Sequence, residues 1–319
     1  MRVAVLDDYQ RVALSYVYWT ELPAGVEVTP LHEHVADLDE LAARLEPFDV
    51  VVAMRERTAL PGALLERLPR LRLIVTTGMV NASIDLAAAA SLGITVCGTA
   101  ATGASTVELT WALILSVVRG IASADSAVRQ GVWQSGTVPG GDLAGNTLGV
   151  VGLGRIGSRV AVIGQAFGMR VLAWSENLTA ERAASAGADL ASSKEELLAA
   201  ADVVTLHLKL SDRTRGIVGA AELALMKPTA YLVNTSRGPL VDERALIAAM
   251  ARREIAGVAL DVYDTEPLPP GHPLLDLPHS VLTPHLGYVS RTGFDVFYRE
   301  IVADIAAFHA GSPVRVVTP

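Results

Sequence analysis

Short apolar runs alternate with alanine-rich amphipathic stretches along the whole chain. Most of these runs are continuous rather than alternating, which is typical of strands buried on both faces of a parallel sheet. The expected strands form a first series, Val3–Leu6, Val26–Leu31, Val50–Met54, Leu71–Thr76 and Ile94–Cys97, and a second series, Leu148–Gly152, Arg170–Trp174, Val203–Leu208, Tyr231–Asn234, Ile255–Leu260 and Val281–Thr283. The pattern predicts an α/β protein with two open parallel sheets.

Two longer helices are expected outside these series. Ser105-Thr106-Val107-Glu108 is a capping-box pattern that opens a long apolar helix to about Arg119. After the last strand, apolar residues recur at helical spacing and Gly311 ends the pattern. That apolar face consists of Phe294, Phe297, Ile301, Ile305 and Phe308. We expect this helix to carry the C-terminus back onto the first sheet.

The order of these elements predicts two domains, one of them discontinuous. The first comprises residues 1–98 and 288–319, and the second comprises residues 99–287.

Composition narrows the class of protein. A chain of 319 residues that is 51% hydrophobic can bury two large cores. A net charge of −8 and a pI near 5.4 argue against nonspecific binding to nucleic acid or to acidic lipid. The single cysteine, Cys97, fits a reducing compartment, and the longest apolar stretch, around Leu109–Val118, is shorter than the roughly 18 residues of a membrane span. We expect a soluble cytoplasmic protein without a metal site.

A glycine fingerprint, Gly152, Gly154 and Gly157, follows one expected strand and precedes an expected helix at Ser158–Phe167. The first glycine permits a tight turn, the second lets a pyrophosphate approach the backbone, and the third lets the helix pack closely on the strand. This context favours a dinucleotide site over a glycine-rich turn that binds nothing.

The residues that follow the expected strand Arg170–Trp174 should decide between NAD and NADP. Glu176 lies 19 residues after Gly157, where a carboxylate would accept the adenosine ribose hydroxyls and repel a 2′-phosphate. No Lys or Arg occurs from Ser175 to Ala180, so NAD is favoured over NADP. The alternative is that Glu176 is a solvated loop residue and that Ser175 faces the ribose.

Three later residues combine a cation, a carboxylate and an imidazole: Arg237, Glu266 and His285. Such a set could orient an anionic substrate and move a proton. Each residue alone has a structural alternative, as a helix cap, a loop residue before proline, or a structural histidine.

The motifs around these residues resemble those of the D-isomer-specific 2-hydroxyacid dehydrogenases, and the resemblance extends over almost the whole chain. It is densest in the segments Val151–Gly157, Asp202–Leu208, Met226–Pro228, Val233–Gly238 and Thr283–His285. The resemblance implies a flavodoxin-like substrate domain and a Rossmann dinucleotide-binding domain, both doubly wound, with the active site in the cleft between them.

By the same resemblance, Arg237, Glu266 and His285 would be catalytic. His285 would exchange a proton with the keto oxygen, since imidazole titrates near working pH. Glu266 would hydrogen-bond the other ring nitrogen, which orients the ring and favours its protonated form. Arg237 would bind the carboxylate and carbonyl oxygens of the substrate.

The resemblance also implies binding residues. Substrate carboxylate would be held by the backbone amides of Met79 and Val80, and Arg55 would contact substrate unless it only forms a surface ion pair. Asp261 would hold the nicotinamide carboxamide, and His207 would lie beside the cofactor. The full set expected to bind cofactor is Gly152, Gly154, Arg155, Ile156, Gly157, Ser175, Glu176, His207, Thr235, Ser236, Asp261 and Gly287.

Together these features predict an NAD-dependent oxidoreductase that interconverts a small 2-keto acid and a D-2-hydroxy acid. The family resemblance implies a homodimer built on the nucleotide domains, with the helix after Ser105 at the interface. Two alternatives remain: an NAD(H)-sensing regulatory protein on the same fold, and a specialised branch acting on another small anion. The formate branch of the family carries glutamine at the position of Glu266, so the carboxylate argues against that branch.

Overall fold

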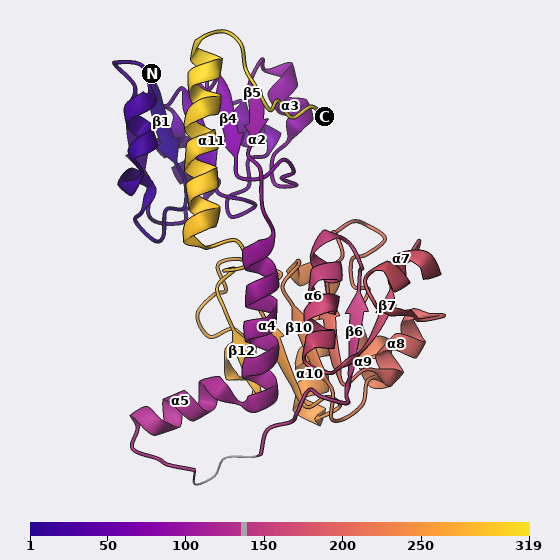
Figure 1. The fold of residues 1–319 in the computed structure, drawn as a ribbon. Helices are drawn as coiled ribbons and strands as arrows, with labels where there is room; N and C mark the ends of the chain where they lie inside the picture. Colours follow the sequence, from indigo (N-terminus) through magenta and orange to yellow (C-terminus); the bar gives the residue numbers. More distant parts are fainter. Residues whose placement is uncertain (135–138) are drawn as a thin grey trace. The chain divides into compact units, whose positions relative to one another are not determined.

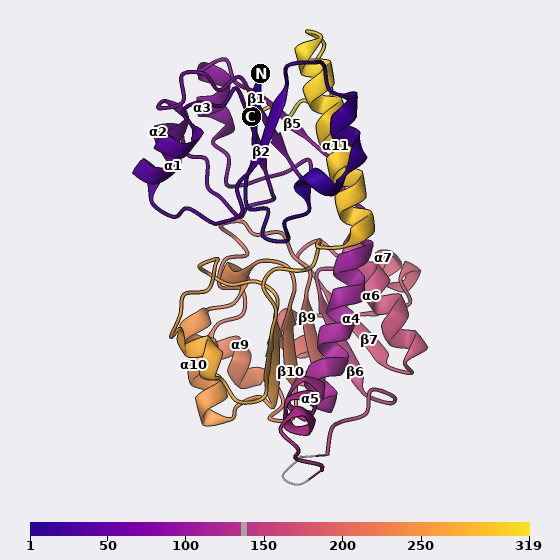
Figure 2. The ribbon, with the colours of Figure 1, turned by 90° about the vertical axis from the view of Figure 1, so that its left-hand side faces the viewer.

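The computed structural model describes residues 1–134 and 139–319. The chain forms two compact units, each a parallel sheet with helices packed on it (Figures 1 and 2). The first unit is Met1–Thr102 with Ser290–Pro319, and the second is Gly103–Val289. Both unit boundaries lie a few residues later in the chain than the domain boundaries expected from the sequence.

The first unit contains a five-stranded parallel sheet in the order β2-β1-β3-β4-β5, a flavodoxin-like arrangement. Its strands are β1 (Arg2–Val5), β2 (Glu27–Pro30), β3 (Val50–Ala53), β4 (Leu73–Thr76) and β5 (Thr95–Gly98). Its helices are α1 (Leu38–Leu45), α2 (Gly62–Leu65), α3 (Leu86–Ser91) and α11 (Arg291–His309), with 3-10 turns η1 (Ala13–Ser15) and η2 (Val17–Glu21). Strands β3 and β4 are buried along their whole length, as continuous apolar runs require.

Helix α11 brings the C-terminal part of the chain onto this sheet, as its apolar face predicts. Phe294, Phe297, Ile301 and Ile305 are buried, whereas Phe308 is only half-buried. The segment that follows lies antiparallel beside β5: the Gly98 amide donates to the Arg315 carbonyl at 3.0 Å and the Val317 amide donates to the Val96 carbonyl at 2.8 Å. The C-terminal segment therefore covers the edge of the sheet.

An ion pair lies under this segment. Asp304, on α11, is completely buried and lies 2.9 Å from Nη2 of Arg315. Burial raises the pKa of Asp304 to about 7, although the guanidinium of Arg315 opposes the shift.

The second unit contains a seven-stranded parallel sheet in the order β12-β11-β10-β9-β6-β7-β8. Its strands are β6 (Thr147–Val151), β7 (Arg170–Trp174), β8 (Asp189–Leu190), β9 (Val203–Leu206), β10 (Tyr231–Asn234), β11 (Gly257–Leu260) and β12 (Ser280–Leu282). Its helices are α4 (Ala104–Arg119), α5 (Ile121–Arg129), α6 (Arg155–Ala166), α7 (Ala180–Ser185), α8 (Lys194–Ala200), α9 (Ala220–Leu225) and α10 (Glu243–Arg252), with η3 (Gly238–Leu240) and η4 (Pro273–Asp276). The strand order is that of a doubly wound Rossmann fold.

Three details differ from the sequence prediction. The capping box at Ser105 is wrong, because α4 begins at Ala104 after Gly103, whose φ of +69° sets the turn, and no side chain caps the helix. Helix α6 begins at Arg155, directly after the glycine turn, rather than at Ser158. Strand β8 was not predicted, because its two residues are exposed and form no apolar run.

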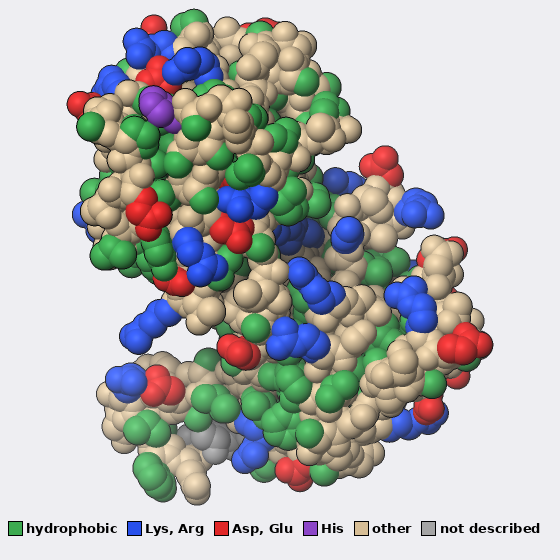
Figure 3. All heavy atoms as spheres, turned by 45° about the horizontal axis from the view of Figure 1, so that its top comes forward, with side chains coloured by type: hydrophobic (Ala, Val, Ile, Leu, Met, Phe, Trp, Pro, Cys, Tyr) green, Lys and Arg blue, Asp and Glu red, His purple; other side chains and the backbone are tan. Residues whose placement is uncertain are grey.

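Charged side chains of both signs are interspersed on the face shown in Figure 3. Among the described residues, no single helix is both long and apolar enough to cross a membrane; α4 and α5, which meet at 67°, reach that length and composition only as a bent pair.

Candidate active site

The turn between β6 and α6 has a backbone that only glycine allows at two positions. Gly152 has a φ of +100°, and a Cβ there would lie 2.7 Å from the backbone of His207. A Cβ on Gly157 would lie 2.1 Å from the Gly152 carbonyl oxygen. Both glycines therefore serve the packing of the turn against β9 and α6.

The middle glycine differs, because a Cβ on Gly154 would meet no atom within 4 Å. Gly154 is exposed and immediately precedes α6, whose first residues, Arg155 and Ile156, lie where helix amides have no partner within the helix. An open backbone next to a helix N-terminus fits a pyrophosphate, which is the role that the sequence assigns to this glycine. The turn thus fits a bound dinucleotide.

The residues expected to select the cofactor follow β7. Ser175 is half-buried, and its carbonyl accepts a hydrogen bond from the Leu178 amide at 3.0 Å. Glu176 is exposed. Both side chains therefore follow directly after β7, where the ribose partner is expected.

His207 lies directly after β9. Its amide donates to the Val151 carbonyl at 2.8 Å, and its Nε2 lies 3.0 Å from Oγ1 of Thr205. Desolvation lowers the pKa of His207 to about 4, so the ring is neutral at neutral pH. A neutral ring beside the glycine turn suits contact with a cofactor better than proton transfer at neutral pH.

The loop after β10 is organised by Asn234, which the sequence analysis did not single out. Its Nδ2 donates to the Arg237 carbonyl at 2.8 Å, and its Oδ1 accepts from the Ser236 amide at 3.0 Å. Oγ of Ser236 donates to the Leu206 carbonyl at 2.7 Å, and Oγ1 of Thr235 lies 2.8 Å from Oγ1 of Thr110 on α4. An Asn at the buried end of a strand was the signal that could have revealed this role.

Arg237 lies in an extended conformation at the end of this loop, and its side chain is half-buried. Its Nη1 donates to the Ser236 carbonyl at 2.6 Å. The next residue, Gly238, packs against the loop after β11 so closely that a Cβ would lie 2.1 Å from the carbonyl carbon of Tyr263. Gly238 therefore brings the Arg237 loop against the segment that carries Glu266.

His285 and Glu266 form a direct pair. Nδ1 of His285 lies 2.6 Å from Oε2 of Glu266, and the two side chains are 14% and 25% exposed. Oε1 of Glu266 accepts the backbone amide of Tyr263 at 2.9 Å. Each carboxylate oxygen thus has one partner, and the imidazole is held by its Nδ1, which leaves Nε2 as the nitrogen for a reacting group.

The backbone around His285 is fixed by a buried carboxylate. His285 has a φ of +53°, and its amide donates to the Thr283 carbonyl at 3.0 Å. Asp261, which is fully buried, accepts the Leu286 amide on Oδ1 at 2.7 Å and the Gly287 amide on Oδ2 at 2.8 Å. Oγ1 of Thr283 also donates to Asp261 at 2.6 Å.

Asp261 therefore anchors the loop that presents His285, in addition to any role toward the nicotinamide that the sequence implies. Burial raises the pKa of Asp261, while its hydrogen bonds and the nearby His285 act in the opposite direction. The ring of His285 is further held edge-on by Tyr288, with ring centroids 5.4 Å apart.

The expected substrate residues lie in the first unit. Arg55 follows β3 with a φ of +54°, and its Nη1 donates to the Thr77 carbonyl at 2.9 Å. Gly78 makes this possible, because a Cβ there would lie 1.9 Å from that nitrogen. Met79 and Val80 follow and are 45% and 67% exposed. The structure thus brings Arg55 and the loop of Met79 and Val80 together.

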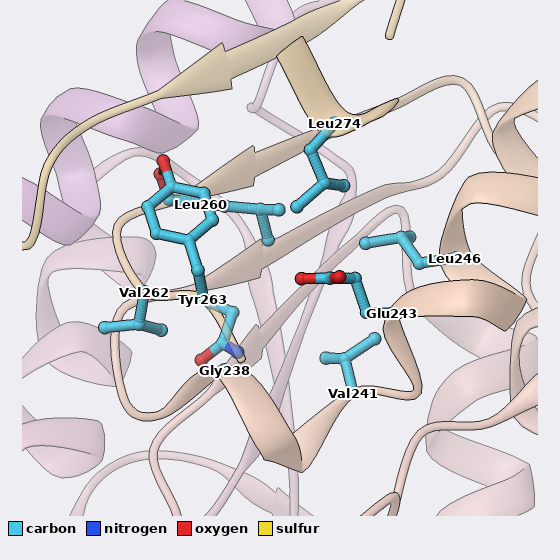
Figure 4. Close-up of a pocket in the computed structure, with 9 residues that line it drawn as sticks. Gly238, Val241, Glu243, Leu246, Leu260, Val262, Tyr263 and Leu274 are labelled. Carbon is cyan, nitrogen blue, oxygen red and sulfur yellow. Dashed lines mark hydrogen bonds between the residues drawn. The ribbon is translucent and has the colours of Figure 1, made fainter. Parts of the chain in front are cut away.

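Figure 4 shows a small hollow beside Gly238 and Tyr263. Its volume is about 10 Å³. Apolar side chains surround the carboxylate of Glu243 there, which pairs with Nε2 of His272 at 3.1 Å. The residues lining the hollow are Asn234, Gly238, Val241, Glu243, Leu246, Leu260, Val262, Tyr263 and Leu274. Arg237, Glu266 and His285 are not among them, so the hollow is a packing gap and not the expected active site.

Within residues 1–134 and 139–319, no three His, Cys, Asp or Glu side chains are grouped to hold a metal ion.

Comparison with known proteins identifies related sequences over both units. Residues 111–287 match the model described as D-isomer specific 2-hydroxyacid dehydrogenase, NAD binding domain. A glyoxylate reductase from Aeropyrum pernix is 44% identical over 236 residues, which cover 72% of this chain and 70% of that protein. A D-3-phosphoglycerate dehydrogenase from Archaeoglobus fulgidus is 34% identical over 316 residues, which cover 99% of this chain but 58% of that protein.

Solved structures agree with these matches. A phosphoglycerate oxidoreductase from Vibrio cholerae has a TM-score of 0.94 and 39% identity, covering 98% of this chain and 100% of that one. A D-lactate dehydrogenase from Aquifex aeolicus, solved with NAD and lactic acid, has a TM-score of 0.78 and 28% identity, covering 97% and 96%.

Proposed function

Because the chain belongs to the D-isomer-specific 2-hydroxyacid dehydrogenases, we propose that it interconverts a 2-keto acid and a D-2-hydroxy acid with NAD, using Arg237, Glu266 and His285. The observation that carries this proposal is the pairing of His285 with Glu266 at 2.6 Å. A histidine held through Nδ1 by a carboxylate presents Nε2 as an acid or base toward a reacting oxygen.

Each residue of this trio has a distinct role in the proposal. His285 donates a proton from Nε2 to the keto oxygen during reduction and takes it back during oxidation. Glu266 keeps the ring oriented and supports the positive charge that the ring carries before donation. Arg237 binds the carboxylate and keto oxygens of the substrate, a task that suits the planar fork of a guanidinium.

The glycine turn and the start of α6 would hold the cofactor. When bound, the nicotinamide supplies or accepts the hydride. Glu176 would select NAD over NADP, because its carboxylate repels a 2′-phosphate and residues 175–180 contain no Lys or Arg.

Met79 and Val80 would bind the substrate carboxylate through their backbone amides. Support comes from the geometry of the loop, where Gly78 has a φ of +101° and the side chain of Arg55 is fixed on the Thr77 carbonyl.

The experiment is a steady-state assay of NADH oxidation with a panel of 2-keto acids, followed by chiral analysis of the product. We expect turnover and a D-2-hydroxy acid. If NADH binds but no keto acid is reduced, the chain is instead an NAD(H)-sensing protein, and the proposal fails.

We also propose a homodimer built on the second unit. Helix α5 has no buried residue, and it extends away from the seven-stranded sheet (Figure 1). Ile121, Val128, Val132 and Trp133, on α5 and just after it, are between 40% and 75% exposed. Helix α4, where the sequence analysis expected the interface, directs most of its large apolar residues into the core. A second copy would bury the apolar side chains of α5.

Sedimentation at micromolar concentration tests this proposal. We expect a dimer for the wild type and a shift toward monomer for Val128→Asp. A monomeric wild type would refute it.

A further inference from the structure

Tyr263 lies between two of the three loops that carry the proposed catalytic residues. It follows β11 and is 8% exposed. Its backbone amide donates to Oε1 of Glu266 at 2.9 Å. Gly238, the neighbour of Arg237, packs against its backbone carbonyl group (Figure 4). The backbone of this one residue therefore touches both the Arg237 loop and the Glu266 loop.

The side chain of Tyr263 reaches the third loop, which carries His285. Its hydroxyl donates to the Thr283 carbonyl at 3.0 Å and to the Leu260 carbonyl at 3.2 Å. The Thr283 carbonyl also accepts the His285 amide at 3.0 Å. Because His285 has a left-handed backbone, with a φ of +53°, surrounding contacts must hold it in this conformation. The Tyr263 hydroxyl is bonded to the same carbonyl that anchors His285.

Neither carbonyl depends on the hydroxyl for a partner. The Leu260 carbonyl accepts the Thr283 amide at 2.9 Å, and the Thr283 carbonyl accepts the His285 amide. The ring of Tyr263 belongs to the apolar core of the second unit, which a phenylalanine ring would fill equally well. Core packing thus accounts for the ring, whereas the hydroxyl acts on the position of the His285 loop.

The hydroxyl is also a stable donor. Burial raises the pKa of Tyr263, and the nearby carboxylates of Asp261 and Glu266 act in the same direction. The hydroxyl therefore keeps its proton over the pH range in which an enzyme works, and its hydrogen bonds to the two carbonyls do not change with pH.

We propose that Tyr263 is a positioning residue for the pair of His285 and Glu266. Its amide fixes the carboxylate, and its hydroxyl fixes the loop that presents the imidazole. This inference rests on the proposed function and adds to it a residue that touches neither substrate nor cofactor in the proposal. It concerns the side chain of Tyr263, whose hydroxyl can be removed without removing the ring.

Tyr263→Phe tests the proposal, first by a measurement that needs no turnover. The ¹⁵N chemical shifts of the His285 ring are recorded by NMR and assigned by their loss in His285→Ala. In the wild type, the carboxylate of Glu266 should keep a proton on Nδ1. In Tyr263→Phe the His285 loop is less fixed, so the Nδ1 shift should move toward that of an imidazole whose proton exchanges between both nitrogens.

The second measurement is steady-state reduction of the best 2-keto acid of the panel as a function of pH. Tyr263→Phe should lower kcat by about 2- to 13-fold, which corresponds to the loss of a neutral hydrogen bond. KM should stay within about twofold, since other residues are proposed to bind the substrate. The alkaline limb should move to lower pH, because Glu266 would support the protonated ring less closely. A merely structural role would lower the free energy of unfolding without moving this limb.

Tyr231→Phe is the matched control. Tyr231 is half-buried at the start of β10, whereas the candidate active site lies beyond the other end of that strand. This variant loses the same hydroxyl group in the same sheet, and it should keep the wild-type ring shifts, kcat and pH profile. A Kd for NADH within about twofold of the wild type would show that both variants are folded.

Unchanged ¹⁵N shifts of His285 in Tyr263→Phe would overturn the inference, and so would an unchanged kcat and pH profile in an active enzyme. Equal changes in Tyr231→Phe would overturn it as well. A wild type that reduces no 2-keto acid would instead overturn the proposed function, while the ring shifts would still decide whether Tyr263 positions His285.

Discussion

Glu266→Gln removes one charge from the candidate active site while keeping the shape of the side chain. In the wild type, Oε1 of Glu266 accepts the Tyr263 amide and Oε2 pairs with Nδ1 of His285. Glutamine has one acceptor oxygen, and the Tyr263 amide requires it. The NH₂ group would then face Nδ1, which can accept only when it carries no proton. The imidazole would be held neutral, with its proton on Nε2.

The expected fall in kcat/KM follows from the loss of the charged hydrogen bond between His285 and Glu266. A hydrogen bond to a charged group contributes about 1.5–3 kcal/mol, which corresponds to about 10- to 150-fold. We expect kcat/KM for keto-acid reduction to fall by that factor. The alkaline limb of the reduction profile should also move to lower pH, because the protonated ring loses its anionic partner. The Kd for NADH should stay within twofold, since Glu266 lies on a different loop from the glycine turn.

The assay is NADH oxidation from pH 5 to 10, with Kd for NADH measured by fluorescence. Glu243→Gln is the matched control, because Glu243 pairs with His272 at 3.1 Å in the same unit and lines the hollow behind the site. The control should retain wild-type kcat/KM and pH profile. A Glu266→Gln variant with wild-type activity and an unshifted profile would refute the assigned role of this pair.

Three other changes have defined outcomes. His285→Ala should lower kcat by about 10²–10⁴-fold in steady-state assays and leave the Kd for NADH within twofold; wild-type turnover would exclude His285 as the acid. Glu176→Ala should reduce the NADH-to-NADPH ratio of kcat/KM, by about 5- to 30-fold if the carboxylate repels the phosphate, and an unchanged ratio would favour Ser175 as the ribose partner. Since burial raises the pKa of Asp304 from 3.8 to about 7, ionisation favours the unfolded state and wild-type stability should decrease as pH rises from about 4 to 7. In urea titrations, the free energy of unfolding of Asp304→Asn relative to the wild type should therefore increase from pH 5 to pH 8, and a pH-independent difference would contradict this.

Strands with long apolar runs were predictable because burial on both faces leaves a continuous signal, as in β3, β4 and β9. The start of α4 was not predictable from the sequence. Ser105 matches a capping pattern, but the backbone of Gly103 sets the actual start of the helix. Strand β8 pairs only with β7 at the sheet edge and is exposed, so its sequence carries no such signal.

Some features of the candidate site could likewise be predicted from the sequence, and others could not. Residue types and order were enough to propose Arg237, Glu266 and His285, and the structure brings the last two into contact. The anchoring role of Asp261 could not be predicted, because its carboxylate accepts the Leu286 and Gly287 amides of a loop that is far away in sequence. The hydrogen bonds of Asn234 are local, to the Arg237 carbonyl and from the Ser236 amide, and its place at the buried end of β10 was the available signal. The left-handed backbone of Arg55 was equally invisible, since arginine is not a residue type that signals a left-handed backbone.

The discontinuity of the first unit has a consequence for the order in which the protein matures. The second unit is one uninterrupted segment, Gly103–Val289, so all of its residues have left the ribosome before the first unit can be complete. The first unit needs α11 to cover its sheet and the segment at Arg315–Val317 to cover the edge of β5. Until those last residues are synthesised, β1 to β5 remain partly uncovered and prone to aggregation. A nascent chain should therefore complete the unit that holds NAD before it completes the unit that carries the loops proposed to hold the substrate.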